Sequence, residues 1–536
     1  MKNIIYKYFH QLLAIKSAIT KREQGIAFLI FSIFAAAFSY FQVITAMFHH
    51  LDTAFMMEVL TSIKESGTPT SHLAPSFGDA LDTFNIGAET ICKADLIPHE
   101  YGESILDTHA YFILYPLAAL TWLFPPHIVL AVANGLGFAS VIFILYWVIR
   151  RQGVPILGAI AFCMLVMAHP AWSHASLGDF YADRFFMPLG LLYVSLLYEA
   201  MIRLNDISRN WLLLVIAVGL LAASTTERGA VMIALFTIAV LVLYWKRITP
   251  CGAKIALTIF SMALLTYVFL YMRLIYVDHH RIQNLLSKLE AFSFSFEPIK
   301  ALVLDARAHE FIAINVLLFG IFAIFDWRLA LIAFAALLPN LFMSMGGAEK
   351  NSWATHYHSI YFPFLAFASA IGFGKLWVSL GTTKYRLILI GFLLALIPAI
   401  YNYSPGYRSG GAIKRLYDFY ANLHPNEINW KNQLKQIAAA VPTGAKVTTV
   451  EKFMSVLYRG RTVYYYPVGI DTADYAVLNR VTQPDGSFYY EGVISYIGES
   501  TKAEICLTRR LKRIGYNLEQ PRLLSGSIVV LERKNK

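Results

Sequence analysis

The 536 residues are 57% hydrophobic and only 15% charged, with a mean hydropathy of +0.53. Soluble globular domains carry about a quarter charged residues, so the composition excludes a chain that is mostly exposed to water. A net charge of +11 could suit nucleic acid, but in membrane proteins Lys and Arg gather in cytoplasmic loops and near anionic headgroups. We therefore predict a polytopic α-helical membrane protein that contacts membrane lipids and has no nucleic-acid partner.

The first segment, residues 1–25, is basic, and Glu23 is its single acid. By the positive-inside rule this N-terminus lies in the cytoplasm. An apolar run then extends from Ile26 to Glu58, and its first part is long enough to cross a bilayer. No small-residue cleavage site follows, so we expect the run to stay as an anchor. The crossing would deliver Asp52 to the outer side.

Residues 53–108 form a polar stretch that is rich in acids and too long for a hairpin. A loop of this length inside a compact protein is usually functional. The next run, 109–124, is apolar but short and contains Pro116, which favours an interfacial or re-entrant helix over a full crossing. The first outer loop is therefore expected to span residues 52–126.

Further apolar runs predict crossings near 127–149, 154–169, 185–202, 211–225, 229–245, 255–276, 311–325, 327–345, 358–378 and 387–404. Every inner turn in this arrangement is basic, as at Arg150-Arg151 and Lys246-Arg247, which agrees with a cytoplasmic position. We predict about eleven transmembrane helices within residues 26–405. The arrangement places the N-terminus inside and the C-terminus outside.

Residues 406–536 return to a soluble composition, and short β-like runs alternate with helical stretches over 446–533. This alternation predicts a small extracytoplasmic α/β domain. Cys92 and Cys506 would share the outer side, so a disulfide between them is open, although two free thiols are the favoured interpretation. With Cys163 and Cys251 they form no CxxC or metal-binding spacing.

Ionisable side chains near the outer face are the candidates for chemistry, because such groups are costly at membrane depth. They are the acids Asp52, Asp179, Asp183 and Glu227, with the basic groups His109, Arg184, Arg228, His356 and His358. Structural roles stay open for several: Asp52 as a helix cap, 179–184 as a solvated turn, and Glu227-Arg228 as a helix-end pair. No third ligand accompanies the two alternate histidines, so no metal site is expected, but a divalent ion is left open.

Several short segments together carry a family resemblance. They are Leu51-Asp52-Thr53-Ala54-Phe55, His109 with Pro116 and Phe124-Pro125, Asp179-Phe180-Tyr181-Ala182-Asp183, Thr226-Glu227, and Arg459 to Tyr464 with Pro467 and Asp474-Tyr475. With them the chain resembles the GT-C superfamily of polytopic glycosyltransferases. It is more closely similar to a bacterial membrane-protein family known as domain of unknown function 2079. The chain departs from that family's pattern where Glu58 replaces a Gln, where a His and a Pro are lost before Asp183, and where a Lys is lost before Glu227.

The resemblance implies an enzyme of a bacterial inner or plasma membrane. It would move a sugar from a polyprenyl-phosphate donor to a cell-envelope glycan, lipid or protein by a single inverting displacement. Asp52 would be the base, since the lipid phosphate is already a good leaving group and needs no acid. Substrate binding would fall to Glu58, His109, Asp179, Asp183, Arg184, Glu227, Arg228, His356 and His358, without a cofactor. The alternatives are a transporter or flippase of a lipid-linked glycan, or a non-catalytic envelope scaffold.

Overall fold

The structure is a computed structural model that divides into two units. Unit 1 comprises Met1–Tyr40, Thr108–Ile113 and Val132–Ala421, and unit 2 comprises Phe41–Asp107, Leu114–Ala131 and Asn422–Lys536. The residues described are 20–46, 51–73, 75–76, 96–98, 102–177, 180–203, 207–248, 250–275, 305–342, 353, 357–403, 417, 419–421, 425–483, 487–491, 500–519, 521–525 and 527–534.

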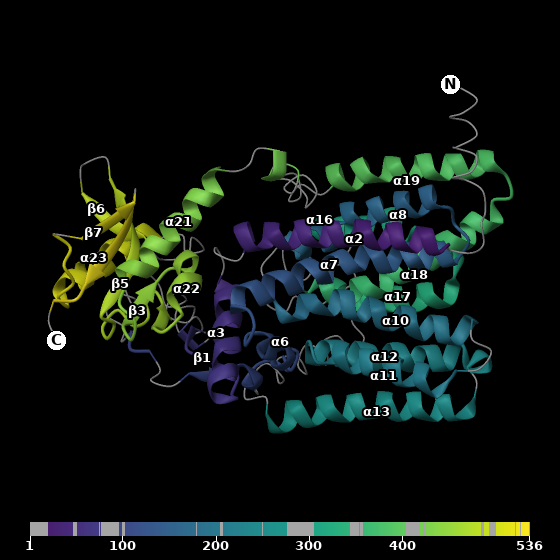
Figure 1. The fold of residues 1–536 in the computed structure, drawn as a ribbon, viewed down its shortest axis with the longest axis horizontal. Coiled ribbons are helices and arrows are strands. Elements are labelled where there is room, and N and C mark those ends of the chain that lie inside the picture. Colours follow the sequence, from purple (N-terminus) through teal and green to yellow (C-terminus); the bar gives the residue numbers. More distant parts are fainter. Residues whose placement is uncertain are drawn as a thin grey trace. The chain divides into compact units, whose positions relative to one another are not determined.

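Unit 1 is helical, and its long helices lie side by side with roughly aligned axes (Figure 1). They are α2 (Lys21–Phe41), α7 (Pro126–Arg151), α8 (Ile156–Ala168), α9 (Pro170–Leu177), α10 (Phe186–Arg203), α11 (Arg209–Ala223), α12 (Glu227–Leu243), α13 (Cys251–Leu274), α16 (Ala306–Ile312), α17 (Trp327–Phe342), α18 (His358–Ser379) and α19 (Thr383–Tyr403). Short 3-10 helices lie at η3 (Ala182–Phe185), η4 (Trp245–Arg247) and η6 (Gly320–Phe325), and η5 (Ala313–Phe319) is π-helical.

Six segments of the described chain are long and apolar enough to cross a membrane. They are Lys21–Ile44, Pro126–Arg151, Cys251–Leu274, Ala306–Phe325, His358–Ser379 and Thr383–Ile400. The pair α8 and α9 makes a seventh if it counts as one span bent by 68°. The bend falls at His169, whose backbone is extended, because a following proline disfavours the helical region. Shorter helices occupy the other predicted ranges, so a count of eleven crossings stays a prediction.

The first apolar run is not one continuous helix. Helix α2 ends at Phe41 and passes into a π-helical turn, η1 (Gln42–Ala46), whereas a separate helix, α3, begins at Leu51 (Leu51–Ser66). The run from Ile26 to Glu58 is therefore divided between two helices. Uniform apolarity cannot reveal this division, because a buried helix and a membrane span have the same composition.

Close backbone contact holds α18 in the middle of unit 1. This helix packs against α10, α17 and η6. A Cβ atom on Gly372 would lie 1.8 Å from the carbonyl oxygen of Phe322, so the two segments can approach only because residue 372 has no side chain. Small residues serve the same purpose at helix interfaces in membranes.

Ion pairs lie at the helix ends that the sequence predicts to be cytoplasmic. Arg150, at the end of α7, donates from Nη2 to Glu23 at 2.7 Å. Lys375, in the last turns of α18, donates from Nζ to Asp326 at 2.7 Å. Arg150 and Asp326 are nearly inaccessible, and each is neutralised by its partner, as a buried charge requires.

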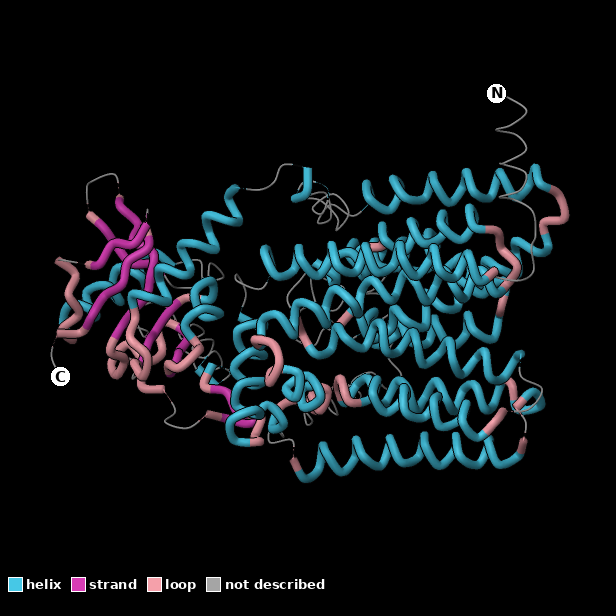
Figure 2. The backbone as a smooth tube through the Cα atoms, viewed as in Figure 1, coloured by secondary structure: helices cyan, strands magenta, loops and turns pink. Residues whose placement is uncertain are grey.

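Unit 2 contains the strands, which are magenta in Figure 2. Its helical segments are η1, α3, the 3-10 turn η2 (Ile105–Asp107), α6 (Leu114–Leu120), α21 (Pro425–Ala440), α22 (Glu451–Leu457) and α23 (Ser500–Arg513). Its strands are β1 (Thr70–Ser71), β2 (Glu103–Ser104), β3 (Lys446–Thr449), β4 (Thr462–Tyr465), β5 (Tyr475–Thr482), β6 (Phe488–Glu491), β7 (Arg522–Ser525) and β8 (Ile528–Glu532).

A six-stranded mixed sheet organises unit 2, with strand order β4-β3-β5-β8-β7 and β6 paired to β5. Strand β3 is parallel to β4 and β5, and the remaining pairs are antiparallel. Its buried residues include Val447, Val477 and Val529, and β-branched residues of this kind suit a buried sheet. Whether this domain is extracytoplasmic stays a prediction.

The cysteines depart from the favoured interpretation. Cys506, within α23, is disulfide-bonded. The interpretation that Cys92 and Cys506 are two free thiols is therefore wrong for Cys506. Cys163 and Cys251 are free, and Cys92 lies outside the described residues. Sequence spacing alone does not predict a bridge between cysteines this far apart, because it depends on the distance between their backbones.

Candidate functional site

Four ionisable side chains predicted from sequence meet in unit 1, and we refer to His109, Asp183, Glu227 and Arg228 as the charged cluster. Glu227 is its best-defined member. One oxygen of its carboxylate accepts hydrogen bonds from the Ala110 backbone N–H at 3.1 Å and from the Thr226 hydroxyl at 3.3 Å. The other oxygen lies 3.4 Å from Nδ1 of His109. The carboxylate therefore joins the start of the 109–124 segment to the start of α12.

The local backbone explains why Glu227 is placed there. Thr226 is extended and immediately precedes α12, so Glu227 occupies the first turn, where the positive end of the helix dipole favours a carboxylate. The backbone N–H of Ile113 donates to the Ser224 carbonyl at 2.8 Å. This bond holds the segment that carries His109 beside the turn between α11 and α12.

The pKa values of the two carboxyl groups of the charged cluster are shifted in opposite directions. Burial raises the pKa of Asp183 to about 6, although the positive charges of His109 and Arg228 oppose the rise. Burial also acts on Glu227, but its bond with His109, the charge of that ring and the backbone donors lower its pKa to about 2. Two acids whose environments push their pKa values apart are a common feature of functional sites. Glu227 is therefore the stronger acid, and Asp183 binds its proton at a higher pH, about 6.

Arg228 provides the cation of the charged cluster. Its guanidinium lies over the ring of Tyr357, 4.4 Å from the ring centre, which is a cation–π contact. Burial opposes the charge on Arg228, but Asp183, Tyr357 and Glu227 raise its pKa above the ordinary value. The guanidinium thus stays charged, and its planar fork suits phosphate or carboxylate oxygens.

Tyrosines complete the surroundings, and sequence reasoning missed them. The ring of Tyr111 stacks on His109 with centres 4.8 Å apart and meets Tyr181 edge-on at 5.8 Å. A signal was present, because Tyr111, Tyr181 and Tyr357 each lie within two positions of a predicted residue. Tyrosine is common in membrane proteins for interfacial reasons, so its type alone did not single these residues out.

The other predicted histidine with a described side chain, His358, has aromatic neighbours. It begins α18, stacks on Trp353 with ring centres 4.7 Å apart and has Nδ1 3.1 Å from the Tyr361 hydroxyl. It is buried in an aromatic group with Phe311. Arg184 is also buried and follows Asp183 in η3.

The side chains of three predicted residues are not described. Asp179 and His356 lie outside the described residues. Asp52 is the second residue of α3, and nothing further is described for its side chain. Its convergence with the charged cluster therefore stays a prediction, and so does its role as a helix cap or as a base.

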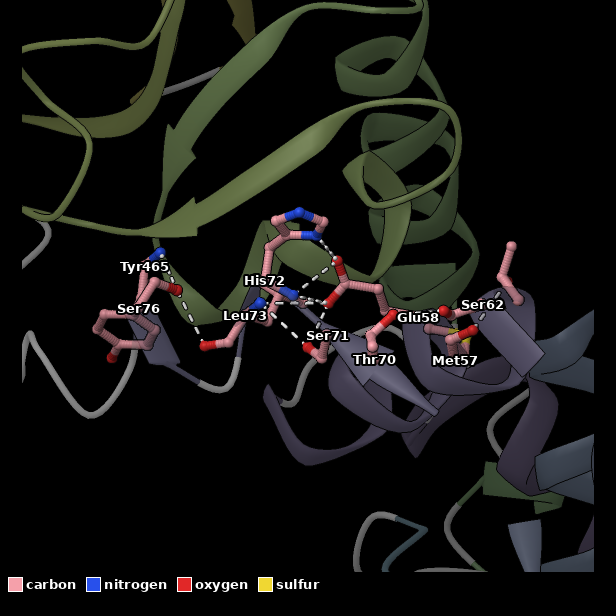
Figure 3. A network of polar contacts seen from close by, with 10 residues as sticks. Met57, Glu58, Ser62, Thr70, Ser71, His72, Leu73, Ser76 and Tyr465 are labelled. Atoms are coloured by element: carbon pink, nitrogen blue, oxygen red, sulfur yellow. Dashed lines mark hydrogen bonds and ion pairs between the residues drawn. The ribbon is translucent and has the colours of Figure 1, made fainter. Parts of the chain in front are cut away.

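Glu58 lies in unit 2 at the centre of a separate polar network (Figure 3). One oxygen accepts from the Ser71 hydroxyl and, at 3.2 Å, from the backbone N–H groups of His72 and Leu73. The other oxygen lies 3.3 Å from Nδ1 of His72. A carboxylate offers about four acceptor positions, so this network fills most of them. Glu58 therefore fixes the 71–73 turn and the orientation of the His72 ring.

An apolar cavity of about 750 Å³ lies between α2, α7 and α8 of unit 1. Phe31, Phe34, Phe143 and Met164 are among its lining residues, and Arg150 lies at its polar edge. That edge belongs to the helix ends opposite those that carry the charged cluster. Among the residues whose placement is described, no three His, Cys, Asp or Glu side chains are arranged to hold a metal ion.

Solved structures similar to this chain include ArnT from Cupriavidus metallidurans bound to undecaprenyl phosphate, with 14% identity, a TM-score of 0.47, and coverage of 94% of this chain and 97% of that one. The apo form of that ArnT gives 13% identity and a TM-score of 0.46 at the same coverage. An Archaeoglobus fulgidus oligosaccharyltransferase in complex with Zn and sulfate gives 13% identity and 0.35, covering 82% and 73% of the two chains. TM-scores this low do not establish a common fold. No protein-family model matches the sequence, and no curated protein sequence matches it.

Proposed function

We propose that the protein is a membrane glycosyltransferase that transfers a sugar from a polyprenyl-phosphate donor to a cell-envelope acceptor on the outer face. The observation that carries this proposal is the convergence of His109, Asp183, Glu227 and Arg228, which come from segments far apart in sequence. Paired acids with a permanent cation are costly inside an apolar helical unit and usually have a function. The resemblance of the short sequence segments to the GT-C superfamily is consistent with this reading.

The proposed transfer needs a base and a cation, and side chains of this protein can supply both. The acceptor hydroxyl needs a base, and we assign that role to Asp52. The departing phosphate needs a cation, and Arg228 is the charged group of the cluster that can bind two phosphate oxygens at once. Glu227 and His109 would orient the sugar, while the buried Asp183 positions Arg228 and does not touch the substrate.

The distribution of charge supports an enzyme over a transporter. Transporters place coupling sites near the bilayer midplane in broken, paired helices. The charged cluster lies instead at the beginning of α12 and in η3, and the ion pairs of Glu23 with Arg150 and of Asp326 with Lys375 lie at opposite helix ends. These charges are grouped at the two ends of unit 1.

The test uses the full-length protein in nanodiscs with a panel of undecaprenyl-phosphate-linked sugars as donors and envelope extract as the source of acceptor. Release of undecaprenyl phosphate, followed by mass spectrometry, measures transfer. We expect Asp52→Asn to lose at least about 100-fold in rate, whereas the control Glu103→Gln, an exposed acid of the same outer loop, keeps it. Transfer by Asp52→Asn at the wild-type rate would remove the assignment of the base.

A further inference from the structure

A second cavity, of about 660 Å³, lies wholly within unit 2. Its size falls in the range of small-molecule sites. Its walls come from α3, β1, the 121–126 turn and the 458–462 segment, and they combine hydroxyl groups, charges and aromatic rings. Glu58, Lys64, Trp122 and Arg459 are among its lining residues.

The charges available in this cavity are mainly positive. Arg461 is largely engaged, because its guanidinium donates to the carbonyls of Ala438, Val441, Pro442 and Arg459. Among the described residues, in contrast, no hydrogen bond or ion pair engages the side chain of Arg459. Lys64 keeps donor capacity, since its ammonium donates once, to the Thr121 carbonyl at 3.1 Å, and an ammonium has three donors.

The acids of the cavity do not cancel these cations. Glu58 is occupied by Ser71, His72 and Leu73 (Figure 3), so it has little acceptor capacity left for a ligand. Glu65 is the other acid of the lining and is exposed to solvent, where screening weakens its effect. Lys64 and Arg459 therefore leave the cavity suited to an anion.

One wall of the cavity is apolar and exposed. Trp122, Leu123 and Phe124 line the cavity and are 70%, 76% and 54% exposed. Three consecutive large apolar side chains in water are unfavourable, but Trp and Phe at a membrane interface are stabilised. Lys64 lies over the Trp122 ring, 5.1 Å from its centre, so a cation and the apolar wall meet at one place. A ligand with an anionic head and an apolar remainder matches both.

We propose that this cavity binds the phosphate headgroup of a membrane lipid, with Arg459 and Lys64 contacting the phosphate and the acyl chains lying along Trp122, Leu123 and Phe124. As a statement about binding, the proposal is independent of catalysis. It rests on the proposed function only where it goes further and names a phosphate-bearing lipid as the class of acceptor.

The experiment measures binding of chain-labelled fluorescent phosphatidylglycerol to the full-length protein in uncharged detergent micelles. We expect diacylglycerol with the same chains, which has no phosphate, to bind at least about tenfold more weakly. We expect sn-glycerol 3-phosphate to compete poorly because it lacks the apolar part. Arg459→Gln and Trp122→Ala should each weaken phosphatidylglycerol binding about tenfold. Arg509→Gln, an exposed arginine of α23, is the matched charge control and should leave binding unchanged.

Each outcome decides the proposal. Equal binding of both lipids, or wild-type affinity in Arg459→Gln, overturns the phosphate site. Full competition by sn-glycerol 3-phosphate shows a soluble phosphate ligand and overturns the lipid assignment. Asp52→Asn should bind phosphatidylglycerol as wild type does while losing transfer. Wild-type transfer by Asp52→Asn, with intact lipid binding, would therefore count against the proposed base and not against this cavity.

Discussion

Replacing Asp183 with Asn tests the electrostatics of the charged cluster. Asp183 is completely buried, and burial raises the pKa of its carboxyl to about 6 from 3.8. Asn keeps nearly the same shape and an acceptor oxygen, but it has no charge to desolvate. Any constant cost of the substitution is the same at every pH, so the informative quantity is how the difference between the two proteins changes with pH.

The direction follows from proton binding. Between about pH 4 and pH 6 the folded wild type holds a proton on Asp183 that the unfolded chain has released, so its free energy of unfolding falls as pH rises. The rise in pKa is roughly two pH units, and each unit corresponds to about 1.4 kcal/mol. Wild type should thus lose on the order of 3 kcal/mol relative to Asp183→Asn across this range, with no further loss above it.

The assay is thermal unfolding of both proteins in the same detergent, followed by tryptophan fluorescence at several values between about pH 4.5 and pH 7.5. The midpoint temperature of Asp183→Asn minus that of wild type should increase by a few degrees as pH rises. In Asp107→Asn, which replaces a more exposed acid, the difference in midpoint temperature from wild type should not change with pH. A difference that stays constant, or that shrinks as pH rises, would refute the buried carboxyl with a raised pKa.

Three further substitutions test the fold and the site. Gly372→Val should destabilise the protein by about 3 kcal/mol through overpacking against Phe322, while Gly381→Ala, which meets nothing within 4 Å, should unfold at the wild-type temperature. Glu23→Gln leaves the buried Arg150 guanidinium without its anion and should cost about 3 kcal/mol; an unchanged thermal midpoint would contradict that. Arg228→Gln should lower the rate of transfer about 100-fold by removing the phosphate cation, and Arg228→Lys should recover part of it; equal rates in all three proteins would exclude contact between Arg228 and the phosphate.

Hydropathy was enough to predict where helices lie. The runs at 127–149, 255–276 and 358–378 coincide with α7, α13 and α18 to within a few residues, because an apolar stretch of membrane length has few other stable forms. The division of the first run between α2 and α3 was not predictable in this way. Both parts are apolar, and the break depends on packing within each unit.

The candidate site was predictable as a set of residues on one side, but not as a set of contacts. Charge and position were sufficient to select His109, Asp183, Glu227 and Arg228. They could not separate these from His358, whose ring packs against Trp353 and Tyr361, because a histidine in an aromatic group and one in a polar cluster look alike in sequence. The bond between the Ala110 backbone and Glu227 was equally hidden, since any residue type can donate it.

The most direct test of the central claim is turnover by the purified wild-type protein of a panel of undecaprenyl-phosphate-linked hexoses and pentoses labelled in the sugar. We predict that one of these donors yields undecaprenyl phosphate and a labelled envelope product in equal amounts, with the anomeric configuration inverted in the product. If every donor stays intact in the presence of envelope extract, with the protein folded, the assignment as a glycosyltransferase is contradicted.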